Sequence, residues 1–225
     1  MEPTLAQVLR AWELSAPLHA PNPGCSADDL AEAARHLDRR LPAAFKQLYA
    51  VAGGGSFLHG NLVLEPLLPA GGNDRASAVT TSADLLRAQD WPIPHGLVMI
   101  GGNGSDDLFG LWAPGDDEAR PLVVQAGEVF EDASFAVVGD DLPSFLAGWT
   151  AYHLLLLGDE LDVGPALDAL GVPAQLRVQS SGLGDEDLDA LLAWSSPHLP
   201  DVHPDPYERG LTAGDLAQIA RAMPY

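Results

Sequence analysis

The sequence predicts an α+β fold, an antiparallel or mixed sheet flanked by helices, with a helical C-terminal appendage. Short apolar runs at 97–100, 108–112, 121–125, 128–130 and 134–138 are separated by turn residues, which is typical of antiparallel strands. Helical periodicity appears before these runs and again over 142–157. Beyond residue 158 the pattern is helical and rich in loops. We therefore expect one sheet-containing core with additions at both ends.

The N-terminal part predicts two helices joined by a linker. Over residues 3–14, Leu5, Val8, Leu9 and Trp12 share one helical face, and Pro17–Pro23 then breaks the helix. Ser26 with Asp29 has the spacing of a capping box, in which side chain and backbone cap each other at a helix start. The helix that follows is expected to run to about Arg39.

Residues 41–57 predict a helix, a tight glycine turn and a strand. Pro42 suits a first helical turn, and Phe45, Leu48 and Tyr49 recur at helical spacing. Gly53–Gly55 should stop this helix, because glycine takes positive φ at little cost.

The remaining elements follow from the same kinds of pattern. We expect a strand over Asn61–Leu67, helices over Ser82–Gln89 and 142–157, and later helices over Asp159–Leu170, Asp185–Trp194 and Thr212–Met223. The predicted organisation is an N-terminal helix and linker (1–25), a central α+β domain (26–157) and a helical appendage of unknown role (158–225). The predicted core consists of Phe45, Leu48, Leu62, Leu64, Ile100, Val123, Phe145 and Trp149.

Composition limits the classes of function. Eleven basic residues against 32 acidic ones give a net charge of −21, which disfavours binding to nucleic acid. The longest apolar run, Leu154–Leu157, is too short to cross a membrane, and the N-terminus lacks the pattern of a secretory signal. We therefore expect a cytoplasmic protein. A single cysteine, Cys25, excludes an internal disulfide.

Four motifs in order resemble the SUKH superfamily, the Smi/Knr-type domains. They are the Leu41-Pro42 helix with its aromatic residues, the turn at Gly53 and Gly54, the stretch IGGNGSDDLFGLW at 100–112, and the late strand followed by Ser144 and Phe145. Ala52 departs from the pattern, since asparagine often precedes the turn glycine in this family. The resemblance covers about residues 26–157. It implies a protein-binding domain of the kind found in bacterial immunity proteins and fungal cell-wall regulators.

No catalytic or metal-binding constellation is recognisable. The stretch GGNGSDD at 101–107 lacks the Gly-Lys-Ser/Thr ending of a P-loop and the ligand spacing of an EF-hand, so it predicts a solvated turn. His198 and His203 lie near Asp201 and Asp205 without a metal-ligand spacing. We expect no enzyme activity, no cofactor and no metal. The weakest alternative is a metal-assisted hydrolase using Asp106 or Asp107 with His95.

The resemblance implies an immunity-type protein that neutralises a toxin by occlusion. A regulatory interaction module without a toxin partner is the alternative. Residues 103–141 carry ten acids and one base, so this segment could attract a basic protein partner. The candidate contact residues, all expected to be exposed, are Asp106, Asp107, Asp116, Asp117, Glu118, Glu131, Asp132, Asp140 and Asp141.

Overall fold

A computed structural model describes residues 2–38, 40–69, 77–87, 97–105, 107–112, 121–126, 136–158, 161–177 and 183–199. Within these ranges the α-helices are α1 (Leu5–Leu14), α2 (Ala27–His36), α3 (Ala43–Val51), α4 (Ala78–Arg87), α5 (Leu142–Leu156), α6 (Gly164–Leu170) and α7 (Asp185–Ser195). Single turns of 3₁₀-helix are η1 (Ala16–Leu18), η2 (Leu58–Gly60) and η4 (Ala174–Leu176). The strands are β1 (Ala20–Pro23), β2 (Ala52–Phe57), β3 (Leu62–Leu64), β4 (Leu97–Gly102), β5 (Leu108–Trp112), β6 (Leu122–Ala126) and β7 (Ala136–Gly139).

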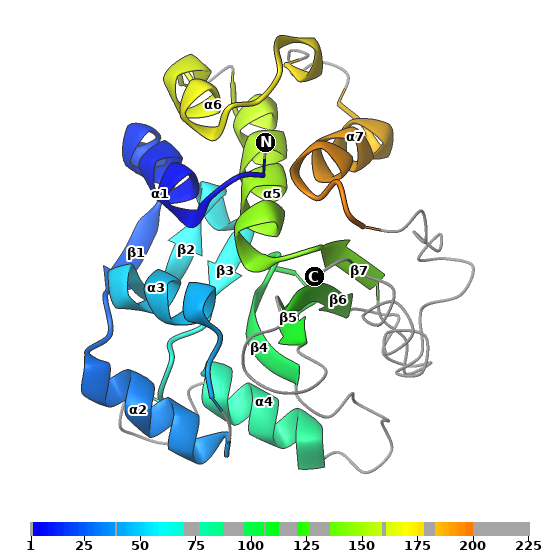
Figure 1. Ribbon diagram of the computed structural model, residues 1–225. Helices are drawn as coiled ribbons and strands as arrows, with labels where there is room; N and C mark the ends of the chain where they lie inside the picture. The colour runs from blue at the N-terminus through cyan, green and yellow to red at the C-terminus, as the bar shows by residue number, and fades with distance from the viewer. Residues whose placement is uncertain are drawn as a thin grey trace.

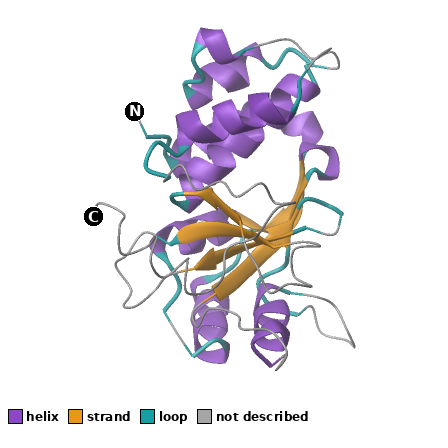
Figure 2. Cartoon of the chain, turned by 90° about the vertical axis from the view of Figure 1, so that its right-hand side faces the viewer, coloured by secondary structure: helices purple, strands orange, loops and turns teal. Residues whose placement is uncertain are grey.

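The described strands form one antiparallel sheet in which each strand pairs with its neighbour in sequence, in the order β1 to β7. The sheet lies between two groups of helices, with α1, α5, α6 and α7 above it and α2 and α4 below it in both views (Figures 1 and 2). The predicted α+β class with an antiparallel sheet is therefore confirmed.

The glycines after α3 lie inside a strand, so the predicted tight turn at Gly53–Gly55 is wrong. Helix α3 passes into β2 at Ala52 without an intervening turn. Gly54 and Gly55 have φ of 107° and 123°, and a Cβ on Gly55 would press on the backbone of β1. These glycines thus allow neighbouring chain segments to approach closely, which is a second use of glycine besides the turn.

The predicted linker between the first two helices is also structured. Residues 16–18 form η1, and Ala20–Pro23 form β1 at the edge of the sheet, paired with β2. Proline is compatible with an edge strand because the N–H that it lacks is not needed by a further neighbour. The pattern Pro17–Pro23 therefore indicated a helix end correctly but concealed an edge strand.

Several element boundaries differ from the predictions. Helix α2 ends at His36, before Arg39, and the chain then turns at Asp38, whose φ is 50°. Helix α4 begins at Ala78, α6 begins at Gly164, and β3 is confined to Leu62–Leu64. The strand predicted at 128–130 and the helix predicted at Thr212–Met223 lie outside the described residues.

All eight residues of the predicted core are buried, so that prediction is confirmed. Their exposed fractions run from 0% for Phe45 to 8% for Trp149. In the middle of the core, the Phe109 ring lies 4.8 Å from that of Phe145 and 5.1 Å from that of Trp149, between centroids. These distances are in the range at which aromatic pairs stabilise a fold beyond the area they bury.

The helices at both ends of the chain share this core. In α1, the Trp12 indole N–H donates to the Thr150 hydroxyl of α5 at 3.0 Å. Leu167 and Leu170 of α6 and Leu191 of α7 belong to the same buried cluster as Phe45. A Cβ added to Gly148 of α5 would lie 2.5 Å from the Ser195 hydroxyl, so α5 and α7 approach closely at this glycine. The division at residues 25 and 157 stays a prediction, and α6 and α7 nevertheless cover surface of the central core.

Phe45→Ala is expected to lower the free energy of unfolding by about 3–5 kcal/mol, because it removes a fully buried aromatic ring and leaves a cavity. Val51→Ala, on the same helix but 58% exposed, is the matched control and should change it by less than about 0.5 kcal/mol. Urea denaturation followed by tryptophan fluorescence measures both. Equal midpoints and slopes for the two variants would contradict the core assignment.

Leu191→Ala tests whether the C-terminal helices unfold with the rest of the chain. Leu191 is 1% exposed, so its truncation should cost about 2–5 kcal/mol. If α7 is part of one cooperative unit, the single unfolding transition moves as a whole. Ala193→Ser, at an exposed position of the same helix, is the control. A separate early transition with the main one unmoved would instead show that residues 158–225 form an independent appendage.

Candidate partner-binding site

The turn between β4 and β5 opens the acidic segment and satisfies its own polar groups. The Asp107 carboxylate accepts a hydrogen bond from the Asn103 amide at 2.8 Å. The Asn103 side-chain oxygen in turn accepts from the backbone N–H and the hydroxyl of Ser105, at 3.0 and 2.7 Å. Asn103, Ser105 and Asp107 therefore hold the turn in shape, as expected for a turn between two strands.

This turn packs against another turn of the chain. Gly104 has φ of 79°, and a Cβ on it would collide with the carbonyl oxygen of Gly60 in η2. Only glycine allows this backbone contact. Gly104 and Ser105 are exposed, as is His59 of η2, so both turns contribute to the exposed surface.

The expected exposure of the nine acidic residues is tested at three of them. Asp107 is half-buried, whereas Asp140 and Asp141 are only 1% and 9% exposed, so for these two the expectation is wrong. The other six, Asp106, Asp116, Asp117, Glu118, Glu131 and Asp132, lie outside the described residues.

Asp141 is buried because it caps helix α5. Its carboxylate accepts the backbone N–H of Ser144 at 2.8 Å, which satisfies one of the otherwise unpaired donors at the helix start. The signal for this role is present in the sequence, since an aspartate directly precedes Leu142 and Pro143 at the start of an apolar helix. The expectation that Asp141 is a surface charge did not take this capping role into account.

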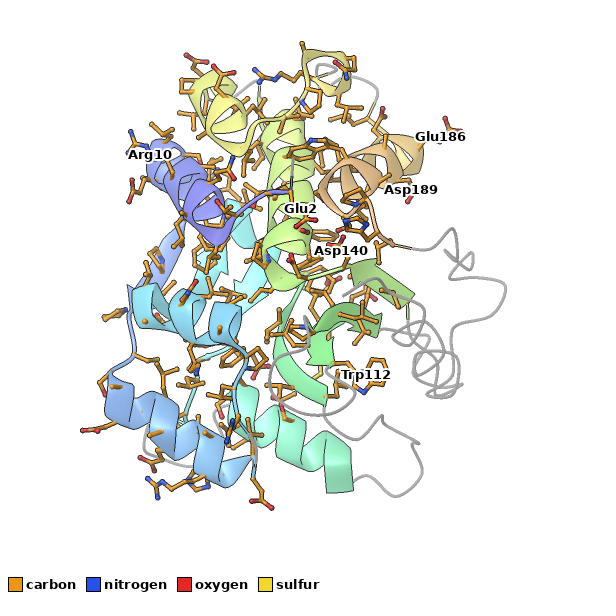
Figure 3. The ribbon with its side chains drawn as sticks, in the orientation of Figure 1. Glu2, Arg10, Trp112, Asp140, Glu186 and Asp189 are labelled. Atoms are coloured by element: carbon orange, nitrogen blue, oxygen red, sulfur yellow. The ribbon has the colours of Figure 1, made fainter. Side chains whose placement is uncertain are left out.

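Asp140 lies at a junction of three chain segments (Figure 3). Its carboxylate accepts the backbone N–H of His198 at 3.3 Å, and its own backbone N–H donates to the Ser196 hydroxyl at 3.4 Å. The His198 ring lies 3.0 Å from the Glu2 carboxylate. The junction joins the end of β7 to the chain after α7 and to the N-terminus. Sequence reasoning missed it because these residues are 58 and 196 positions apart.

Burial raises the pKa of Asp140, and the neighbouring Asp141 raises it further. The Ser144 hydroxyl is close enough to oppose this rise, yet by hydrogen-bond geometry neither it nor Oδ1 of Asp140 has a partner among the described side chains. The junction thus serves the fold, and its carboxylate is poorly placed to attract a partner.

Of the three residues considered for a metal-assisted hydrolase, only Asp107 lies in the described part of the chain. The described residues contain no group of three or more His, Cys, Asp or Glu side chains placed to hold a metal ion. Asp107 is occupied by Asn103, while His95 and Asp106 lie outside the described residues. Cys25 is a half-buried free thiol whose pKa is raised by burial and by Asp29.

His153 is a buried histidine on α5. It is 7% exposed, its ring packs against Trp149 and Tyr152, and neither ring nitrogen has a hydrogen-bond partner. Burial lowers its pKa to about 4, so the ring is neutral at pH 7. Burying the imidazole without partners costs stability, and the side chain has no described neighbour that would make it a base or a ligand.

Comparison with known families agrees with this geometry. The model of the SMI1/KNR4 family (SUKH-1) matches residues 24–148, which is more than half of the chain. The chain belongs to the SMI1/KNR4 family. The match covers the structure from the start of α2 to the middle of α5 and leaves α1, α6 and α7 outside. No curated protein matches this SUKH-1 chain.

Membership supports a non-catalytic binding role in general terms, since the SUKH family includes immunity proteins and cell-wall regulators. None of the described helices is long and apolar enough to cross a membrane. Of the motifs that resembled the family, the Leu41-Pro42 helix, the stretch at 100–112 and the Ser144-Phe145 helix all lie within the matched range.

The neutral His153 predicts a loss of stability in acid. Its pKa is about 4 in the folded chain and 6.5 when exposed, so the unfolded chain binds the extra proton and stability falls as the pH drops from 6.5 to 4. At pH 5 this amounts to about 2 kcal/mol. His153→Phe should remove that part of the pH dependence and be most stabilising in acid.

Urea denaturation at pH 8 and pH 5 measures the effect, as the difference between the wild type and His153→Phe. His36→Gln is the control, because it also removes an imidazole, but from an exposed position on α2 that lacks the burial of His153. Equal losses of stability between pH 8 and pH 5 in the wild type and in His153→Phe would show that His153 is not buried in its neutral form.

Proposed function

We propose that this SUKH-1 protein neutralises a toxin by binding to it and covering its active surface, inside the cell that makes both. The observation that carries the proposal is the family match over residues 24–148, because the family is generally non-catalytic and includes immunity proteins. The absence of a recognisable catalytic motif in the sequence points the same way.

We further propose that the acidic segment after β4 contacts the partner. With Asp140 and Asp141 excluded by their burial, seven candidates remain: Asp106, Asp107, Asp116, Asp117, Glu118, Glu131 and Asp132. A cluster of this sign would speed capture of a basic protein such as a nuclease, whose own surface is suited to phosphate. Its main effect would be on the association rate, because exposed charges are screened by salt.

A regulatory interaction module is the second candidate, since the same family includes cell-wall regulators. Co-expression separates the two. The gene beside this one, expressed alone, should arrest growth if it encodes the toxin, and this protein should restore growth and co-purify with its product. A harmless neighbour that forms no complex would refute the toxin proposal and favour the regulatory role.

The acidic contact is tested by charge reversal. A variant with Asp106, Asp116, Asp117 and Glu118 all replaced by lysine should associate with the partner at least about tenfold more slowly at low salt. Raising the salt concentration should reduce the difference from wild type, because it screens the steering field. Surface plasmon resonance at several ionic strengths gives the rates.

The matched control reverses the same number of acids elsewhere, at Asp28 and Glu32 on α2 and at Glu186 and Asp189 on α7. It changes net charge equally, and in Figure 3 Glu186 and Asp189 lie at the outer side of α7. If both variants slow association alike, only total charge matters. If neither does, the acidic segment is a solubility feature and the interface lies elsewhere.

A further inference from the structure

The turn that follows β2 is held in an unfavourable backbone conformation. Leu58, His59 and Gly60 have φ of 54°, 55° and 94°, which are left-handed values. Only Gly60 adopts such a value without steric cost, and non-glycine residues in this region need surrounding contacts to hold them. Leu58 is fully buried, so its side chain supplies part of that hold.

His19 holds the backbone N–H at the start of this turn. The Leu58 N–H donates to Nδ1 of His19 at 3.2 Å. Nε2 of the same ring lies 2.9 Å from the Ser15 hydroxyl, which donates to the Ala11 carbonyl at 2.8 Å. Because an amide can only donate, Nδ1 must be unprotonated, and Nε2–H then donates to Ser15. The contacts thus require a neutral ring in one tautomer.

The surroundings of His19 favour this neutral form. The ring packs at 5.9 Å from Trp12 of α1 and 5.6 Å from Phe57 of β2, between centroids. Burial lowers its pKa to about 4, and the neighbouring His59 contributes in the same direction. Of the described groups around the ring, Ser15, Trp12, Phe57 and Leu58 are uncharged, and His59 is the titratable neighbour that lowers the pKa of His19.

We propose that His19 is an acid-sensitive latch on the left-handed turn Leu58–Gly60. While the ring is neutral it accepts the Leu58 N–H and keeps the turn closed. When Nδ1 gains a proton, two donors face each other, the hydrogen bond is lost and the backbone of the turn relaxes. Protonation is complete only well below neutral pH, so the latch is closed at pH 7.

Release of the turn would reach the candidate contact segment. Asn61, next to the turn, donates to the Leu58 carbonyl at 2.7 Å, and its own carbonyl accepts the Trp149 indole N–H at 2.9 Å. Gly60 touches Gly104 of the β4–β5 turn. An opened latch therefore loosens one end of the sheet where the acidic segment begins. The latch itself does not rest on the proposed function and is tested without a partner.

Amide hydrogen exchange by NMR, expressed as protection factors at pH 7 and pH 4, tests the latch on the full chain. Between these values the protection of Leu58 should fall at least about tenfold, because its N–H loses its acceptor when Nδ1 of His19 gains a proton. The amides of Ile100 and Val123, in the core strands, should keep higher protection than Leu58 throughout.

Three variants separate the latch from general acid sensitivity. His19→Asn places an untitratable amide oxygen near the position of Nδ1 and should abolish the acid-dependent loss at Leu58. His19→Ala should leave Leu58 poorly protected at both pH values. His36→Asn, at an exposed position on α2, should behave like the wild type.

The proposal is overturned if His19→Asn and the wild type lose protection in parallel, or if Leu58 loses it only together with Ile100 and Val123. A ring measurement gives an independent decision should a variant fail to fold. If the ¹⁵N shifts of wild-type His19 at pH 7 show a protonated Nδ1, the latch does not exist.

Discussion

Helix α5 has no polar face, and the rest of the structure depends on covering it. Twelve of its fifteen residues are buried, including residues on every side of the helix. A helix that is apolar all round is stable in water only when surrounded by protein. The sheet covers one side, through Phe109 against Phe145 and Trp149, and α1, α6 and α7 contact the others. Helices α1, α6 and α7 lie outside the family match, yet they bury the apolar surface of α5, the last helix that the match reaches.

Local pattern predicted the core and most elements because those features depend on neighbouring residues. Phe45 and Leu48 are buried where their helical spacing placed them, and Ser26 caps α2 with Asp29 as its spacing indicated. The role of the glycines was harder to predict, because Gly53–Gly55 could equally end a helix or allow a neighbouring strand to approach closely. The neighbour in question, β1, is about thirty residues earlier in the chain, and no local signal specifies that pairing.

The candidate site was less accessible to sequence reasoning, because the same side chain can steer a partner or satisfy a backbone. Asp107 and Asp141 look alike as acidic residues of one charged segment. One shapes a turn through Asn103, and the other caps a helix through Ser144. Asp140 is buried through contacts with residues almost sixty positions away. Charge counts therefore describe the field of the segment, whereas capping geometry decides which of its members contribute to an accessible surface.

The two prolines of β1 have a consequence for the behaviour of this protein at high concentration. An open sheet edge is a template on which a strand of another molecule can add, and such additions lead to aggregates. β1 is exposed at every residue, but Pro21 and Pro23 offer no N–H to an incoming strand, so a regular ladder cannot grow there. The same short strand that completes this side of the sheet thus protects this edge from strand addition.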